Sequence, residues 1–398
     1  MATPCELSPA LSPQAYRLYR LDAIFLGHKW DPQVFDRSAI ADRAILVAEE
    51  DWSELSAAAE TLFGETLLVE RTLQRRARES GRAEYLPRRA ARRLAHLADP
   101  PATNARLMRF DFHPTSEGWR LSEVNSDVPG GLNEATVFQQ LWPSRSANWR
   151  DTGQPGESYV QKLIDTFALG ARSRVGLIHA TAYSDDWQHM AFLRDLLAQR
   201  GIEAIGVAPT SIELDAGRML VDGEPLDAAL RFFPGDWLLF SREGPPWFAR
   251  HPASLSNPLH ALFSQNKFFP IACATADIEI PTWQRYLPAT AALRIVDLVG
   301  SSDVAKPSFG RVGEGIATIS RLRTRDRIGI AMHVLLSKGT WVRQRKFDSI
   351  NVGSQREPQH VCIGVYCVDG KAVGCYGRIS PHEIVGMSAA DAPVFVTN

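Results

Sequence analysis

The sequence lacks the marks of a disulfide-stapled, exported or membrane-spanning protein. Its five cysteines contain no CxxC pair, so neither a disulfide framework nor a cysteine zinc site is indicated. No apolar run approaches the roughly 18 to 20 residues that a bilayer-spanning helix needs. The first residues, MATPCELSPALSPQAYR, also lack a basic region followed by an apolar stretch. We therefore expect a cytoplasmic protein with no membrane association.

The chain also lacks a large net charge of either sign. Its 44 basic and 45 acidic residues give a formal charge of −1, which excludes a global field that would attract nucleic acid or anionic lipid. Any anion must therefore be held locally. Lysine is scarce among the basic residues, so each lysine raises the question of a specific role. The lysines are Lys29, Lys162, Lys267, Lys306, Lys338, Lys346 and Lys371.

A length of 398 residues allows two or three domains, and the patterns divide the chain into four segments. Residues 1–104 have helical periodicity, which predicts a helical N-terminal layer. Nine arginines between 71 and 93 form either a solvated helix face, which we favour given the neutral overall charge, or an anion-binding surface. Residues 105–170 begin with a predicted hairpin. Residues 171–256 and 257–398 follow as separate segments.

The two later segments have different patterns. RVGLIHA, the helical DDWQHMAFLRDLLAQRG and IEAIGVAP predict a parallel βαβ unit within 171–256. The last segment is predicted to be α+β, with strands at SDVAKP, TWVRQRKF, VCIGVYCV and AVGCYGRI and a helix at TRDRIGIAMHVLL. The fold class is therefore a mixture of α/β and α+β.

The predicted hairpin carries the first candidate site. It consists of LMRFDF and WRLSEVN, joined by HPTSEG. Residues two apart in a strand share a face, so Arg109 lies beside Asp111, and Glu123 beside Asn125. If Asp111 pairs with Glu123, all four side chains converge on one face. Oxygen ligands of this kind suit Mg²⁺, and the arginine suits a phosphate or carboxylate. The alternative is a solvent-facing hairpin with an Arg–Asp ion pair.

A glycine-rich segment forms the second candidate site. In SDVAKPSFGRVGEG a short apolar strand ends at Lys306 and continues into a loop. Glycine permits close backbone approach, so the amides of such a loop can face phosphate oxygens while the lysine supplies a point charge. The loop residues of interest are Ser308, Gly310, Gly313 and Gly315. The segment does not match the P-loop string, and a simple tight turn is an equal alternative.

Three further residues are candidates for binding. Lys267 in SQNKFF stands beside aromatic residues and has either an anionic partner or a snorkelling position on the surface. Arg378 lies in a predicted strand, where its charge needs a partner. A structural ion pair is the alternative to a binding role. Gln344 can present its amide to a nucleobase. Serine-hydrolase and zinc-protease motifs are absent from the sequence, and the histidines show no paired spacing, so we expect them to be structural.

Taken together, these motifs resemble the circularly permuted branch of the ATP-grasp ligases, which is represented by glutathionylspermidine synthase. In that branch an Arg-x-Asp strand, followed twelve residues later by Glu-x-Asn, precedes the nucleotide lysines. Arg109, Asp111, Glu123 and Asn125 reproduce this spacing. SQNKFFP and KPSFGRVGEG resemble the family's two lysine segments, and GVYCVDGKAVGCYGRIS resembles its late arginine strand. KWDP, at 29–32, matches more loosely, and Val312 stands where the family favours Glu.

The resemblance implies an ATP-grasp-like fold in circularly permuted order with a pre-ATP-grasp unit. It further implies a carboxylate–amine ligase that uses ATP and Mg²⁺ and forms an acyl phosphate. The small-molecule acid and amine stay unnamed.

By this resemblance the metal ligands are Asp111, Glu123 and Asn125. Lys267, Lys306, Gln344 and the glycine loop bind the nucleotide, and Arg109 and Arg378 stabilise the transition states. The alternatives are a noncatalytic nucleotide-binding scaffold and a small-molecule kinase.

Overall fold

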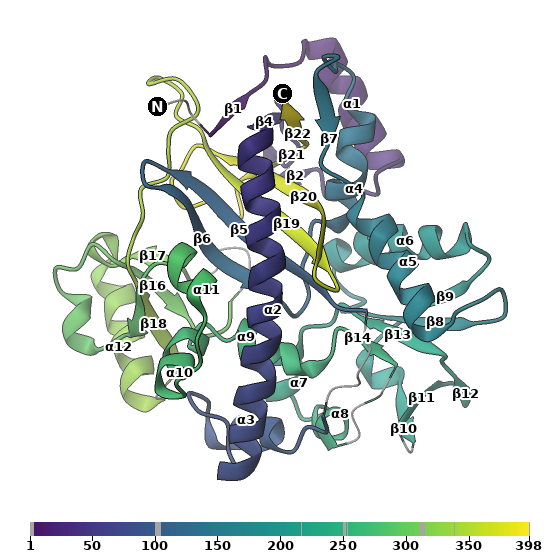
Figure 1. Ribbon diagram of the computed structural model, residues 1–398, viewed down its shortest axis with the longest axis vertical. Coiled ribbons are helices and arrows are strands. Elements are labelled where there is room, and N and C mark those ends of the chain that lie inside the picture. The colour runs from purple at the N-terminus through teal and green to yellow at the C-terminus, as the bar shows by residue number, and fades with distance from the viewer. Residues whose placement is uncertain are drawn as a thin grey trace.

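The structure is a computed structural model that describes residues 4–99, 105–215, 217–249, 252, 254–310, 315–337 and 339–397. Its central element is an antiparallel five-stranded sheet, ordered β21-β20-β19-β5-β6, which joins strands from distant parts of the chain (Figure 1). The strands are β5 (Leu107–Thr115), β6 (Gly118–Asn125), β19 (His360–Val368), β20 (Lys371–Ser380) and β21 (Ala390–Ala392). The predicted hairpin and both late strands are confirmed.

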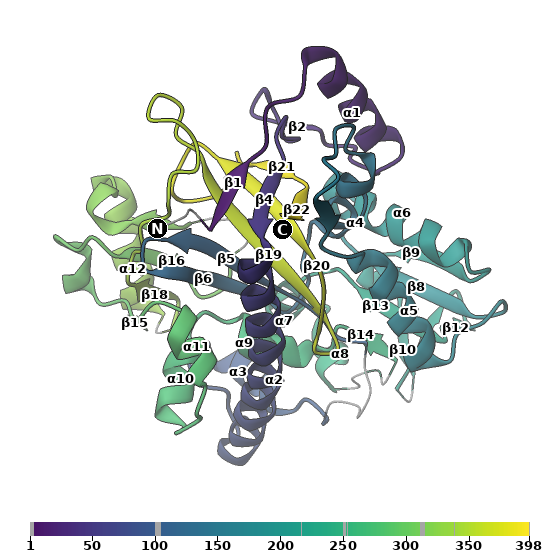
Figure 2. The ribbon, with the colours of Figure 1, turned by 45° about the horizontal axis from the view of Figure 1, so that its top comes forward.

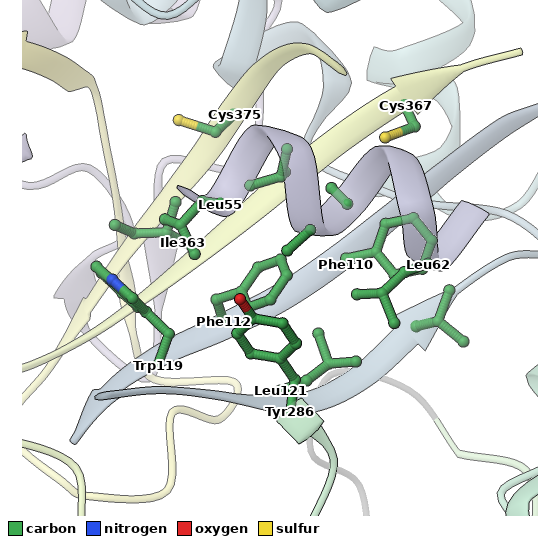
Figure 3. Packing of buried hydrophobic residues seen from close by; sticks show 14 of the residues in the cluster. Leu55, Leu62, Phe110, Phe112, Trp119, Leu121, Tyr286, Ile363, Cys367 and Cys375 are labelled. Atoms are coloured by element: carbon green, nitrogen blue, oxygen red, sulfur yellow. The ribbon is translucent and has the colours of Figure 1, made fainter. Parts of the chain in front are cut away.

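One face of this sheet is apolar because its strands alternate. Phe110 and Phe112 of β5 and Ile363 of β19 point to the same side and are fully buried. The helix α2 (Glu49–Ser80) lies lengthwise over this side, and its Leu55 and Leu62 pack into the same cluster (Figures 1 and 3). Burying an aliphatic or aromatic side chain contributes roughly 1.5 to 3 kcal/mol. The polar residues of these strands must therefore face away from α2.

A second sheet corrects the expectation of a purely helical N-terminal layer. Its order is β1-β4-β22-β7, with β1 (Cys5–Leu7), β4 (Ile45–Ala48), β7 (Trp149–Asp151) and β22 (Val394–Thr397). The run AILVA was expected to be helical, but β4 is a strand that pairs in parallel with β22. Helical and buried-strand patterns cannot be distinguished over so short an apolar run. Pairing with β22, more than 340 residues away along the chain, makes this run a strand.

The βαβ prediction is confirmed by a parallel sheet ordered β14-β13-β8-β9. The strand β8 (Arg174–Ile178) pairs in parallel with β9 (Glu203–Val207), and α6 (Ser184–Ala198) connects them. The sheet is completed by β13 (Ala228–Arg231) and β14 (Leu255–Ser256). A separate hairpin of β10 (Glu213–Asp215) and β11 (Arg218–Val221) follows β9 along the chain, with β12 (Glu224–Pro225) paired to β11.

A fourth sheet carries the second lysine segment. Its order is β15-β18-β16-β17, with β15 (Thr290–Ala292), β16 (Val304–Pro307), β17 (Ala317–Thr318) and β18 (Trp341–Gln344). The predicted helix here is α12 (Thr324–Leu336). In Figure 2 this sheet and the parallel sheet lie on opposite sides of the central sheet.

The remaining elements are connections and covers. Within the described residues, no helix is both long and apolar enough to cross a bilayer. The arginine-rich segment is predominantly exposed, as the solvated-face interpretation predicts, with only Arg93 half-buried. The other helices are α1 (Pro13–Phe25), α3 (Arg88–Ala95), α4 (Leu132–Leu141), α5 (Pro155–Phe167), α7 (Gly235–Phe240), α8 (Pro245–Ala249), α9 (Leu262–Gln265), α10 (Phe269–Thr275) and α11 (Pro281–Tyr286), and a short ladder joins β2 (Gln33–Val34) to β3 (Arg37–Ser38).

Candidate functional site

The hairpin register places the four predicted residues opposite one another. Asp111 pairs with Glu123 and Arg109 with Asn125 across β5 and β6, before a bulge follows Asp111. Because α2 covers the apolar face, these side chains point to the other side of the sheet. The convergence that the spacing predicts is therefore confirmed.

Arg109 and Asp111 form a bidentate ion pair. The Nε of Arg109 lies 2.7 Å from Oδ1 of Asp111, and its Nη2 lies 2.9 Å from Oδ2. Burial lowers the pKa of Arg109 and the Asp111 carboxylate raises it, and the net effect is a pKa above the ordinary value. Gly364 of β19 makes room for this pair, because a Cβ there would lie 2.7 Å from Cδ of Arg109 and 2.8 Å from Oδ1 of Asp111.

Glu123 is more accessible than Asp111. Asp111 also accepts a hydrogen bond from Nδ2 of Asn125 at 3.0 Å, so both of its oxygens already have donors. Glu123 has a looser contact, with Oε2 3.5 Å from Nζ of Lys267. Glu123 and Asn125 thus retain oxygen atoms for a ligand, whereas Asp111 mainly orients its neighbours.

The two predicted lysines approach Glu123 from separate segments. Nζ of Lys267 donates to the carbonyl of Gly310 at 3.3 Å, and the amide of Lys267 donates to the carbonyl of Ser308 at 2.9 Å. Nζ of Lys306 donates to the carbonyl of Ser122, beside Glu123, at 3.0 Å. Segments far apart in sequence therefore bring two ammonium groups to one carboxylate.

Lys306 is buried beside one carboxylate, that of Glu123, and a second ammonium group, that of Lys267. Burial lowers its pKa, Glu123 partly opposes this, and Lys267 lowers the pKa further, to about 8. An ammonium group in this environment favours an added anion, because an anion restores the stabilisation that water gave. This part of the site is suited to a phosphate.

Arg378 lies on the same face of the central sheet, on β20. It pairs in register with Cys362 of β19 and with Asp391 of β21. Its Nη2 donates to the carbonyl of Gly386 at 2.6 Å, and its Nε lies 3.9 Å from Oδ1 of Asp391. Burial lowers the pKa of Arg378, Tyr376 and Asp391 raise it, and the net shift is upward.

Gln344 and the residues of the glycine-rich loop are the other residues predicted to bind the nucleotide. Gln344 is buried and donates from Nε2 to Oγ1 of Thr290 at 3.0 Å. The amide of Ser308 donates to the carbonyl of Thr340 at 2.8 Å, and Gly315 has the left-handed φ of 70° that glycine favours. Gly313 lies outside the described residues.

A cavity of about 640 Å³ collects most of these groups. The predicted residues that line it are Arg109, Asp111, Glu123, Asn125, Lys306, Gln344 and Arg378. Lys267 instead lines a small adjoining pocket that also includes Glu123, Lys306 and Gln344. Ser308, Gly310 and Gly315 are outside the cavity lining.

The residues fit Mg²⁺ only together with phosphate oxygens from a ligand. Among the described residues, no group of three or more His, Cys, Asp and Glu side chains is arranged to hold a metal ion. Mg²⁺, however, is usually bound by one or two carboxylates plus substrate phosphates and water. Glu123 and Asn125, next to two ammonium groups, meet that requirement.

The opposite end of the cavity contains residues that the sequence analysis did not single out as a site. It includes Lys29, Glu134, His189 and Asp391. The scarcity of lysine and the KWDP segment drew attention to Lys29, but no spacing rule connects it to its partners. All five cysteines, by contrast, are buried and free, as expected.

Comparison with known proteins identifies the class. The family model described as "Glutathionylspermidine synthase preATP-grasp" matches residues 23–397, and the chain belongs to this family. The family that the sequence motifs resemble is thereby confirmed.

Two individual proteins are similar to this chain. One is a Haemophilus influenzae protein provisionally named an acid–amine ligase, 23% identical over 219 residues. That match covers 52% of this chain and 54% of the relative, about half the length of each. The other is the apo structure of a glutathione synthetase-like effector from Globodera pallida, with a TM-score of 0.62, 10% identity and coverage of 97% of this chain and 98% of that one. This chain has the same mixed α/β fold.

Proposed function

We propose that this protein is an ATP- and Mg²⁺-dependent carboxylate–amine ligase that forms an amide bond through an acyl phosphate. The observation that carries the proposal is the arrangement around Glu123: a carboxylate and amide from one hairpin face two lysines from separate segments. The family and the name of the Haemophilus influenzae relative support a ligase.

We also propose the circularly permuted order and the four-segment division at 104, 170 and 256. Pairing of β5 with β19 supports the permuted order, because this pairing joins the hairpin to the last segment of the chain. In the permuted order the hairpin precedes the two lysine segments along the chain and completes the site that they form.

In the first half-reaction, Lys267 and Lys306 hold the nucleotide phosphates, while Glu123 and Asn125 hold Mg²⁺, which screens phosphate charge. A carboxylate oxygen of the acid forms a bond to the γ-phosphorus as the bond to the β,γ-bridging oxygen breaks. The products are ADP and an acyl phosphate. Arg109 is fixed by Asp111 and stabilises the charge that develops on the transferred group.

In the second half-reaction, the nitrogen of a neutral amine forms a bond to the acyl carbon. The carbonyl oxygen becomes negative, and Arg378 on the same face of the sheet stabilises it. Collapse of this intermediate expels inorganic phosphate, and the amine nitrogen releases its proton to solvent.

The test is ADP release by the purified chain, screened with amino acids and peptides as acids and with amines as acceptors. We expect release that requires Mg²⁺ and both substrates, with an amide product detected by mass spectrometry. An acid-dependent but amine-independent phosphorylated product would identify a kinase instead. ATP binding without turnover in any substrate pair would favour a noncatalytic scaffold.

A further inference from the structure

Gln265 joins the first lysine segment to the end of the hairpin. It is the last residue of α9, two residues before Lys267, and its side chain is half-buried. Its Oε1 accepts hydrogen bonds from the amide of Ser126 at 3.0 Å and from the amide of Asp127 at 3.2 Å. Ser126 and Asp127 directly follow Asn125, the last residue of β6. One glutamine oxygen therefore connects two segments that lie far apart in the sequence.

The backbone that Gln265 contacts is itself held firmly. Ser126 and Asp127 are at most 1% exposed. The carboxylate of Asp127 accepts a hydrogen bond from the amide of Gly235 at 2.8 Å and forms a buried ion pair with Arg231. Because these contacts fix Ser126 and Asp127, their amides determine where Gln265 and the start of the lysine segment lie.

The same two contacts determine how the side-chain amide of Gln265 is oriented. An atom that faces two N–H donors must be the oxygen, so Nε2 is the other atom of the amide. Among the described residues, the hydrogen bonds of this side chain all end on Oε1. The two N–H groups on Nε2 are therefore left for a ligand.

The Gln265 side chain borders the part of the site that we propose binds phosphate. It lines the main cavity together with Glu123, Asn125 and Lys306, and it also lines the small adjoining pocket that includes Lys267. Phosphate oxygens accept hydrogen bonds strongly because they carry charge. An amide N–H adds a donor for such an oxygen without adding to the repulsion between the two ammonium groups.

We propose that Gln265 has two roles in this site. Its Oε1 positions Lys267 relative to Glu123 and Asn125, and its Nε2 donates a hydrogen bond to a phosphate oxygen of the nucleotide. The second role rests on the proposed ligase function, whereas the first does not. One side chain then connects the hairpin, the lysine segment and the ligand.

The first test separates the two roles by comparing two variants in the absence of nucleotide. Gln265→Glu keeps an oxygen that can accept from both backbone amides but loses the donor. Gln265→Met has a similar shape but neither group. We expect Gln265→Met to lower the melting temperature by roughly 2 to 4 °C, and Gln265→Glu by less than half as much. Equal melting temperatures of the two variants would overturn the positioning role.

The second test measures the affinity of each variant for a nonhydrolysable ATP analogue with Mg²⁺, by calorimetric titration. Both variants should bind about tenfold more weakly than the wild type or worse, because a hydrogen bond to a charged acceptor is lost. Gln265→Glu should be the weaker binder, since its carboxylate repels phosphate, although it is the more stable variant. Wild-type affinity in Gln265→Glu would overturn the donor role.

Gln139→Met is the matched control, because it removes a similar contact elsewhere in the fold. Gln139 lies in α4, its Oε1 accepts the amide of Thr152 at 2.8 Å, and it lines neither pocket. This variant should lower the melting temperature at least as much as Gln265→Met and leave the affinity for the analogue unchanged. An equal loss of affinity in the control would show that the Gln265 variants report only general destabilisation, and would overturn the proposal.

Failure of the proposed function gives a different result from failure of the positioning role. Absence of analogue binding by the folded wild-type protein contradicts the nucleotide site and, with it, the donor role of Nε2. The melting temperatures of Gln265→Glu and Gln265→Met need no nucleotide, so they decide the positioning role in either case.

Discussion

The two ends of the cavity differ in how their buried lysines are paired with carboxylates. At the Lys29 end, contacts of 2.6 and 2.7 Å join one ammonium to two carboxylates. At the Lys306 end, two ammonium groups share Glu123, with Lys267 at 3.5 Å and Lys306 donating to the carbonyl of Ser122. The pKa of Lys29 is raised, whereas that of Lys306 is lowered to about 8.

This difference indicates what each end is built to bind. A buried ammonium group that is already paired with two carboxylates has no need of a further anion, and the pairing holds the elements that carry these groups together. A buried group with excess positive charge gains stability from an anion. The comparison therefore favours the proposal that the Glu123–Lys267–Lys306 end binds phosphate.

The largest effect is expected when the Lys306 end loses Glu123, its proposed metal ligand. Glu123→Ala should reduce ATP turnover by about 100-fold or more, because the charge on the transferred phosphoryl group is then less well stabilised. Folding should be retained, since the side chain is only loosely held. The control Glu117→Ala removes an exposed carboxylate at the tip of the same hairpin and should be neutral. Full turnover with an ordinary Mg²⁺ requirement in Glu123→Ala would disprove the metal assignment.

A smaller effect should follow when the Arg109–Asp111 pair is displaced from β19. Gly364→Ala puts a Cβ within 2.8 Å of both side chains, so overpacking should cost about 1 to 3 kcal/mol in the free energy of unfolding. The control is Gly64→Ala in α2, where a Cβ meets nothing within 4 Å; there the change should stabilise by up to about 1 kcal/mol. Urea unfolding checks both. Equal stability of the two variants would contradict the close packing of this pair.

The affinity for nucleotide should depend on pH because of Lys306. The pKa of Lys306 in the free protein is about 8, below its usual value, so the ammonium form is lost as the pH rises through 8. Affinity should therefore be highest below pH 8 and fall about tenfold by pH 9, with proton uptake on binding. In Lys306→Gln this dependence should disappear. A wild-type affinity that stays constant between pH 7 and 9 would rule out Lys306 as the phosphate partner.

The smallest effect is expected at the Lys29 end. Tyr376→Phe removes one hydrogen bond to Asp391 but leaves Lys29 in place, so the free energy of unfolding should fall by about 1 kcal/mol. Thermal unfolding with and without nucleotide measures this. Loss of nucleotide affinity in this variant would show that the two ends do not act separately.

The site was predictable where it depends on strand geometry. Alternation over two residues, together with the pairing of Asp111 with Glu123, determines which side chains of the hairpin meet, and the register confirms it. The βαβ unit follows from its apolar runs for the same reason. Gly364 was not singled out, because its role depends on a third strand.

The features of the fold and site that the sequence did not predict depend on contacts between distant segments. The strand β4 is defined by its pairing with β22, and a short apolar run carries no mark of that partner. Lys29 meets Glu134 and Asp391 only after three segments fold together. That Asp111 is committed to Arg109, leaving Glu123 more accessible, depends on side-chain geometry that spacing does not reveal.

Calorimetric titration of the wild-type protein with ATP and with a nonhydrolysable analogue, with and without Mg²⁺, tests the central claim most directly. The account predicts binding that strengthens with Mg²⁺, and predicts that Glu123→Ala loses the Mg²⁺-dependent part. Absence of nucleotide binding by the folded protein, or binding indifferent to both Mg²⁺ and Glu123, would contradict it.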